Sequence, residues 1–177
     1  RDIIWRSRAP EAAVLLASLL LSPDVPATEH PRLLRALDFH TGEQKDAALT
    51  TLLLSDSKDN PATYLEAFQR ATPKFLKAHP EVMHRVEPAL LASKGTVTFV
   101  DLVARFNRRD LADHLMDMVQ AHPEKEAAIR AARQVLAFGE GKRIEAALKK
   151  PKRVAAFVKT LGFVGTKEST ALLQAVA

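Results

Sequence analysis

Histidine is the residue type in this sequence with the widest chemistry, because imidazole binds metal ions and transfers protons near neutral pH. No two of the histidines form the HExxH pair that holds zinc on a helix. Three of them precede a proline, which places them at breaks between helices. We therefore predict exposed or capping roles, and no catalytic or metal site, for the six histidines: His30, His40, His79, His84, His114 and His122.

Two further patterns resemble functional motifs at first sight. Asp113 and Asp117 are four residues apart and share a helix face, but a solvated acidic face explains this spacing without a metal ion. The string Gly139-Glu-Gly-Lys142-Arg143 lacks the Gly-x-x-x-x-Gly-Lys-Ser/Thr spacing that cradles phosphate groups, so we interpret it as a turn between helices. The sequence also has no Gly-x-Ser-x-Gly elbow, which would present a hydrolase nucleophile.

The chain contains no cysteine. This absence excludes disulfides, cysteine-based zinc sites, cysteine nucleophiles and covalently attached c-type haem within these residues. We expect no cofactor in this chain.

Positive charge is unevenly distributed along the chain. Residues 140–160 contain seven basic and two acidic side chains, so this stretch has the same net charge, +5, as the whole chain. Such a run is either a solvated helix surface or a contact for an anionic partner. The candidate partner-binding residues are Lys142, Arg143, Lys149, Lys150, Lys152 and Arg153.

Pro151 divides this basic run between two predicted helices. Lys149 and Lys150 are predicted to end the first helix, where the helix dipole favours cations. Lys152 and Arg153 begin the second, where the dipole disfavours them. We therefore expect Lys152 and Arg153 to be the better candidates for partner contact.

These side chains must be positioned by helices. Ala and Leu account for 29 and 24 of the 177 residues, and Ile and Val together for only 17, a bias toward strong helix formers. Apolar positions such as Val14, Leu15, Leu19 and Leu20 recur at helical spacing. Helices are predicted after Pro10, Gly42, Asn60, Thr72, Pro80, Thr98, Asp110 and Thr166, with a kink or restart at Pro88, and over residues 31–39, 124–138, 144–148 and 151–161.

About eleven short helices joined by short loops predict an all-α fold. We expect an irregular right-handed α-solenoid of HEAT/armadillo-like antiparallel helix pairs, whose repeats run roughly 40–47 residues. Residues 97–103 are the best strand candidate, but a Thr98–Asp101 capping box favours helix there.

No apolar run approaches the ~20 residues of a membrane span. We predict one domain over residues 1–177 and interpret the chain, which begins with neither Met nor a signal peptide, as a fragment of a longer protein.

A resemblance to a known family rests on four strings, at residues 1–8, 34–39, 99–107 and 127–139. Together they resemble the HEAT-like helical region of large bacterial multidomain proteins, in which a sorbosone-dehydrogenase-like β-propeller or similar module precedes the helices and a c-type haem-binding domain follows. The resemblance implies a spacer or docking module of an exported, redox-linked protein of the periplasm or cell envelope. It places any c-type haem elsewhere in the parent protein, because the Cys-x-x-Cys-His motif has no counterpart here.

Two hypotheses on function follow. The first is a non-catalytic helical-repeat scaffold, monomeric as a fragment, that binds neighbouring domains of its own chain or another protein. Trp5, Arg6 and Arg8 would then contact the preceding domain.

The alternative is a nucleic-acid-binding HEAT-like module resembling the DNA glycosylases of that fold. We expect no specific nucleic-acid partner, because residues 1–139 balance in charge and aromatic residues do not interleave with the basic run. No motif supports a third reading, a hydrolase or metal enzyme.

Overall fold

The computed structural model of the chain describes residues 9–55 and 61–175, and over these residues it contains helices and turns but no strand. The all-α prediction is confirmed. Trp5, Arg6 and Arg8, and the predicted start signal at Asn60, lie outside the described residues. Contacts divide the chain into two compact units, residues 1–92 and 93–177, which are described in turn. The prediction of one repeat domain over residues 1–177 stays a prediction.

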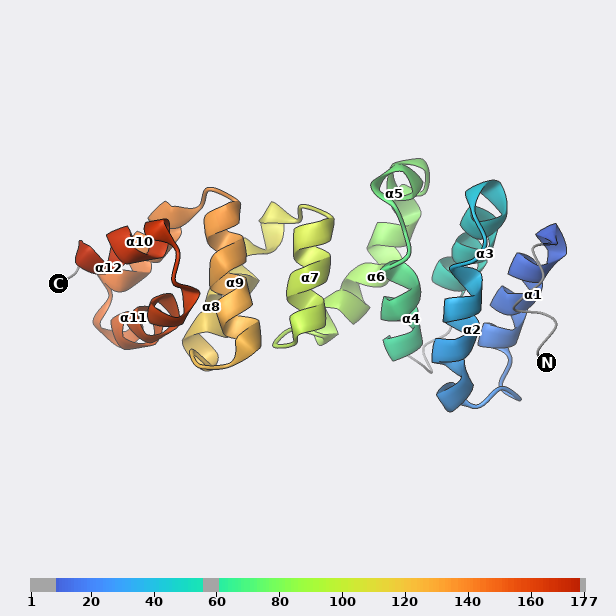
Figure 1. The fold of residues 1–177 in the computed structure, drawn as a ribbon, viewed down its shortest axis with the longest axis horizontal. Coiled ribbons are helices and arrows are strands. Elements are labelled where there is room, and N and C mark those ends of the chain that lie inside the picture. The colour runs from blue at the N-terminus through green and yellow to red at the C-terminus, as the bar shows by residue number, and fades with distance from the viewer. Residues whose placement is uncertain (1–8, 56–60, 176–177) are drawn as a thin grey trace. The chain divides into compact units, whose positions relative to one another are not determined.

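The first unit is built on α3, which packs against α1, α4 and α6 (Figure 1). Helix α2 packs against α1 and α4, and the short α5 packs against α6. A single 3-10 turn, Ala27–Glu29, precedes α2. The α-helices of this unit are α1 (Pro10–Leu21), α2 (His30–Leu37), α3 (Gly42–Leu54), α4 (Pro61–Phe68), α5 (Pro73–Ala78) and α6 (Pro80–Ala92).

The second unit is built on α9 and α11. Helix α9 packs against α7, α8 and α11, and α11 also contacts α8, α10 and α12. A 3-10 turn, Arg109–Leu111, leads into α8. The α-helices of this unit are α7 (Val97–Arg105), α8 (Ala112–Ala121), α9 (Glu126–Ala137), α10 (Gly141–Leu148), α11 (Pro151–Val164) and α12 (Lys167–Gln174).

Each unit has its own apolar core. Phe68 and Phe75 are fully buried in the first unit, and Phe99 and Phe157 in the second. Burying such a side chain stabilises the fold by about 1.5–3 kcal/mol. Helix α9 contributes mostly alanine to the core, and these small side chains let its backbone approach its neighbours closely: Ala127, Ala128, Ala131 and Ala132.

Threonine hydroxyls cap the N-termini of three of the described helices. The hydroxyl of Thr72 accepts a hydrogen bond from the Phe75 N–H at 3.0 Å, as its Thr-Pro signal predicts. Thr166 forms a reciprocal capping box with Ser169 at the start of α12. The predicted Thr98–Asp101 capping box is wrong: α7 begins two residues earlier, because Thr96 is the extended cap whose hydroxyl accepts from the Phe99 N–H.

Other boundaries also differ from the sequence prediction. Helix α6 continues through Pro88, so the helix does not restart there. Helix α11 continues through Gly162 to Val164 and ends at Gly165, whose φ of 65° is the left-handed conformation that glycine adopts most easily. The predicted end of this helix at residue 161 is therefore wrong, because Gly165 has the backbone angle that stops the helix.

The apolar positions predicted for α1 are buried only in part, at Leu20. Val14 and Leu15 are about half exposed, whereas Leu16 and Leu20 are buried. The whole helix is rich in Ala and Leu, so helical spacing alone does not decide which face points inward. Packing against α2 and α3 makes that choice.

Candidate functional site

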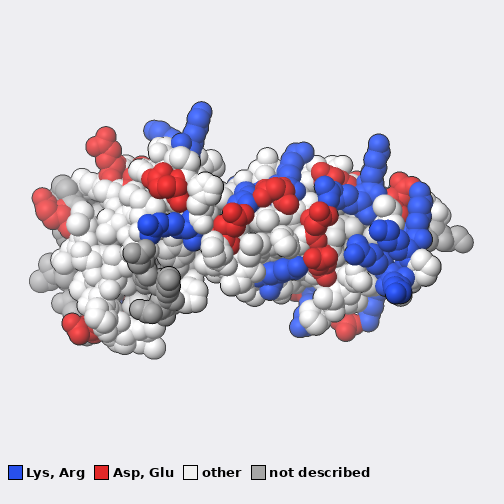
Figure 2. Space-filling view, turned by 180° about the vertical axis from the view of Figure 1, so that it is seen from behind, with Lys and Arg blue, Asp and Glu red and all other residues white. Residues whose placement is uncertain are grey.

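The six candidate basic residues all lie on or between α10 and α11 in the second unit. Figure 2 shows blue side chains gathered over the part of the second unit that holds α10, α11 and α12, with red side chains among them. Lys142 and Arg143 lie in the first turn of α10, and Lys149 is its C-cap. Lys150 is the N-cap of α11, so the prediction that it ends the preceding helix is wrong. Lys152 and Arg153 follow in the first turn of α11.

Arg143 is held by two carboxylates of its own unit. Its Nη1 lies 2.6 Å from Asp113 Oδ1 on α8, and its Nε lies 2.9 Å from Glu140 Oε2. The hydrogen bond to Glu140 and the charge of Asp113 raise the pKa of the Arg143 guanidinium. Arg143 therefore ties α10 to α8, and its charge is compensated locally.

Two other lysines of the basic run are also paired. Lys149 Nζ lies 2.6 Å from Glu145 Oε1, one turn back on α10. The hydrogen bond from Lys149 and the charge of Lys149 lower the pKa of Glu145, and the charge of Lys142 adds a smaller effect. Lys159 forms an ion pair with Glu124 and lowers the pKa of that carboxyl in the same way. These lysines stabilise the local structure and leave little charge for a partner.

Three cations at the α10–α11 turn have no such compensation. Among the described residues, Lys150, Lys152 and Arg153 form no ion pair, and we name these three residues the basic corner. Lys150 and Lys152 are exposed and Arg153 is half-buried. Lys152 and Arg153 also sit at the positive end of the α11 dipole, which disfavours cations. The basic corner is therefore a concentration of positive charge that the unit itself does not neutralise.

The acidic pair on α8 serves as an anchor for cations from other segments. Asp113 is bonded to Arg143, and Asp117 Oδ2 lies 2.9 Å from Lys94 Nζ. Both aspartates are exposed, as we predicted for a solvated acidic face. The described residues contain no cluster of His, Cys, Asp and Glu suited to a metal ion.

The histidines take three kinds of position. His79 and His122 are the C-caps of α5 and α8, where their backbone N–H groups bond Phe75 O and Met118 O, as a capping role predicts. His84 is exposed and His114 half-buried.

His40 contradicts the prediction of exposed or capping roles, because its exposed fraction is only 3%. His30 is also buried, but it caps the 3-10 turn Ala27–Glu29, where its backbone N–H bonds Ala27 O. His30 Nδ1 lies 2.8 Å from Thr63 Oγ1 on α4. His40 Nε2 is buried without a hydrogen-bond partner among the described residues. In the turn between α2 and α3 the side chain of His40 is buried whereas that of Phe39 is 53% exposed, and no sequence pattern signals this difference.

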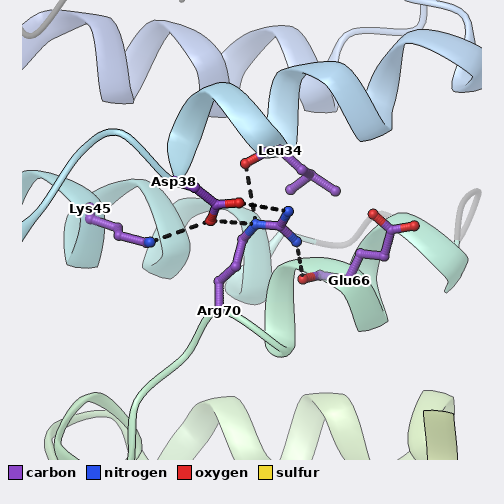
Figure 3. Close-up of polar contacts among 5 residues, drawn as sticks. All are labelled: Leu34, Asp38, Lys45, Glu66 and Arg70. Atoms are coloured by element: carbon purple, nitrogen blue, oxygen red, sulfur yellow. Dashed lines mark hydrogen bonds and ion pairs between the residues drawn. The ribbon is translucent and has the colours of Figure 1, made fainter.

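Sequence reasoning did not identify Arg70, a cation of the first unit that forms several hydrogen bonds. Arg70 follows α4 and bonds Asp38 through Nε at 2.9 Å and Nη2 at 3.1 Å (Figure 3). It also donates to the backbone carbonyls of Leu34 and Glu66 at 3.2 and 2.7 Å. Arg70 thus ties α2 to α4. Its partner Asp38 lies 32 residues earlier, so no local spacing points to it.

Comparisons with known proteins give no information on the family or function of the chain. No protein-family model, curated protein or solved structure matches the chain. Among the described residues, no helix combines the length and the apolar character that crossing a membrane requires.

Proposed function

We propose that this chain is a non-catalytic helical-repeat scaffold that binds an acidic surface of another domain or protein through the basic corner. The observation that carries the proposal is the contrast within one short stretch. Arg143, Lys149 and Lys159 are each neutralised inside the unit. The three residues of the basic corner are not. Uncompensated exposed charge steers and orients an oppositely charged partner.

A repeat architecture is consistent with this role. Successive helices of the second unit pack on each other, α8 on α9 and α10 on α11. We infer that they form the irregular right-handed solenoid of HEAT/armadillo-like pairs predicted from the sequence. Solenoids of this kind offer extended binding surfaces and need no catalytic residue.

The resemblance supplies a context for the partner. We propose that the chain is a spacer or docking module within an exported, redox-linked multidomain protein of the periplasm or cell envelope. The partner would then be a neighbouring domain of the same chain, or another protein. Any c-type haem would be held by the parent protein outside these residues, since they contain no cysteine.

Nucleic acid is the alternative partner, because the same three cations could contact phosphates. The corner is small, however, and each neutralised phosphate contributes a slope of about −0.9 to the dependence of log affinity on log salt. Three contacts give a slope no steeper than about −3, which is characteristic of weak, sequence-independent binding. We therefore expect DNA binding by this chain to be weak and non-specific.

A titration with two labelled probes tests the proposed function. The probes are a glutamate-rich peptide and a mixed-sequence DNA duplex, each followed by fluorescence anisotropy near physiological salt. The variant Lys152→Ala/Arg153→Ala is expected to weaken peptide binding about fivefold, the size expected for two rim charges. The matched control is Lys74→Ala/Lys77→Ala, which removes two exposed lysines of α5 and the same net charge.

Equal weakening by the control pair would show that only net charge matters and would refute the basic corner as the binding surface. Submicromolar, sequence-selective DNA binding that is lost in the double variant of the corner would favour the nucleic-acid module instead.

A further inference from the structure

Helix α11 buries one face and exposes another that is mostly apolar. The buried face consists of Phe157, Thr160, Leu161 and Val164. On the exposed face, Phe163 and Val158 are 54% and 40% exposed, which is unusual for large apolar side chains. The small residues Ala155 and Gly162 are exposed beside them, and the same face also carries Lys159, whose charge is paired with Glu124.

The exposed residues form a continuous row. Ala155, Val158 and Gly162 follow the i, i+3, i+7 spacing that aligns side chains along one side of a helix, Lys152 precedes Ala155 by three residues, and Phe163 flanks the row next to Gly162. A Cβ atom added at Gly162 would meet nothing within 4 Å, so the surface there is open. Small side chains at 155 and 162 allow another backbone to approach closely, and Val158 and Phe163 supply apolar area.

The unit anchors α11 from its buried side. Thr160 Oγ1 donates to the Pro123 carbonyl at 2.8 Å, in the turn between α8 and α9. Arg133 Nη2 on α9 donates to the carbonyls of Val164 at 3.1 Å and Phe163 at 3.4 Å, which satisfies the end of the helix. The exposed row is thus presented on a fixed helix, and binding need not first order it.

Charge distinguishes the two ends of this row. The basic corner lies at its N-terminal end, and Lys152 is both a member of the corner and the first residue of the row. Helix α11 carries no Asp or Glu, so a second copy of α11 would bring no carboxylate to the corner. A complementary occupant needs an apolar stripe and carboxylates near one end.

We propose that the exposed face of α11 is a seat for an amphipathic helix of the partner, with the acidic end of that helix beside Lys150 and Lys152. This inference rests on the proposed function, because the basic corner orients the helix. It adds that the apolar row contributes affinity and that the partner segment is helical. In helix-in-groove binding of this kind, apolar side chains at helical spacing on the bound helix pack against the apolar surface.

Three synthetic peptides of about 18 residues, long enough to form a helix on binding, test the seat with the whole chain. The first has an apolar stripe at helical spacing and three glutamates at one end. The second has the same composition with the stripe scrambled, and the third has lysines in place of the glutamates. Only the first is expected to bind with a dissociation constant below about 100 µM.

Two variants of α11 probe the apolar row. Val158→Ser/Phe163→Ser is expected to weaken binding of the first peptide about tenfold, because two exposed apolar side chains lose their burial in the complex. Val14→Ser/Leu15→Ser is the matched control, since these residues are similarly exposed in the other unit, and it is expected to leave binding unchanged. Gly162→Gln should block close approach of the peptide without unfolding α11, because the added side chain meets open space. Far-UV circular dichroism and the urea midpoint of each variant verify that it is folded.

The outcomes separate the seat from the proposed function. If Lys152→Ala/Arg153→Ala weakens peptide binding but Val158→Ser/Phe163→Ser and Gly162→Gln do not, the seat is refuted and the acidic-partner function stands. Equal binding of the scrambled peptide, or no binding of any peptide at about 100 µM, also refutes the seat. A dimer in sedimentation that is lost in Val158→Ser/Phe163→Ser would show that a second copy occupies the face instead.

Discussion

At the scale of single residues, Arg70 shows how an exposed-looking charge becomes a structural tie. Its guanidinium bonds a carboxylate on α2 and backbone carbonyls at Leu34 and Glu66. The planar fork of arginine suits this arrangement, because it donates in several directions at once. A lysine at the same position could not reproduce it.

We predict that Arg70→Ala destabilises the first unit by about 2–3 kcal/mol, because two carbonyls and a carboxylate lose a charged donor. Urea unfolding followed by circular dichroism measures the loss. Lys45→Ala is the comparison, since its Nζ is 3.5 Å from Asp38 and exposed pairs contribute at most about 1 kcal/mol. Similar losses in the two variants would contradict the role assigned to Arg70.

Tyr64 is the only tyrosine of the chain, so its ionisation can be followed without ambiguity. Its hydroxyl donates to the Leu53 carbonyl, and burial raises the pKa of Tyr64 above its usual value, with the charge of Arg85 opposing. A raised pKa in the folded state means that this contribution to stability is present below pH ~10 and is lost as the pH rises through the folded value.

We therefore predict that absorbance at the phenolate band titrates at higher pH in the native chain than in urea. The free energy of unfolding should fall with pH above ~10, and this fall should be smaller in Tyr64→Phe. Titration at the same pH in native and denatured chain would disprove the effect of burial on this hydroxyl.

At the scale of elements, α11 shows that two glycines three residues apart play opposite roles. Gly162 lies inside the helix with open space around its Cβ position, whereas Gly165 ends the helix with a positive φ. Glycine is costly inside a helix and favoured at its left-handed end.

We predict that Gly162→Ala stabilises the second unit by about 0.5–1 kcal/mol, because alanine is the better helix former. Gly165→Ala should destabilise it by about 1 kcal/mol, because a side chain strains the left-handed conformation. Thermal or urea unfolding of the two single variants measures both changes in stability, which are expected to have opposite signs. A gain at both positions would mean that the helix continues past Gly165.

At the scale of the whole molecule, contacts gather into two compact units. Each unit has buried phenylalanines and its own interhelical ties, such as Arg70 with Asp38 in the first and Arg143 with Asp113 in the second. A unit with its own core and its own polar ties has what it needs to fold separately.

We predict that residues 93–177 expressed alone are helical and unfold cooperatively in urea. Within that fragment, Leu115→Ala should cost about 2–5 kcal/mol, because Leu115 is fully buried and its loss leaves a cavity. Circular dichroism at increasing urea provides both measurements. A broad, non-cooperative transition in the unsubstituted fragment would show that the second unit depends on the first.

The local features of this protein could be predicted from the sequence by itself. Helix content follows from Ala and Leu propensity, and helix starts follow from cap residues such as Thr72 and Thr166, whose hydrogen bonds reach only three residues along the chain. The basic run and the absence of cysteine are also properties of composition, and they limit which chemistry is possible.

Tertiary packing decided everything that depends on residues far apart in the chain. It chose which face of α1 is buried, turned His40 into the core and paired Arg143 with Asp113, thirty residues away. It also separated the neutralised cations from Lys150, Lys152 and Arg153, and left Val158 and Phe163 exposed on α11. The physical reason is that burial and ion pairing are set by which helices pack together, and spacing within one helix does not carry that information.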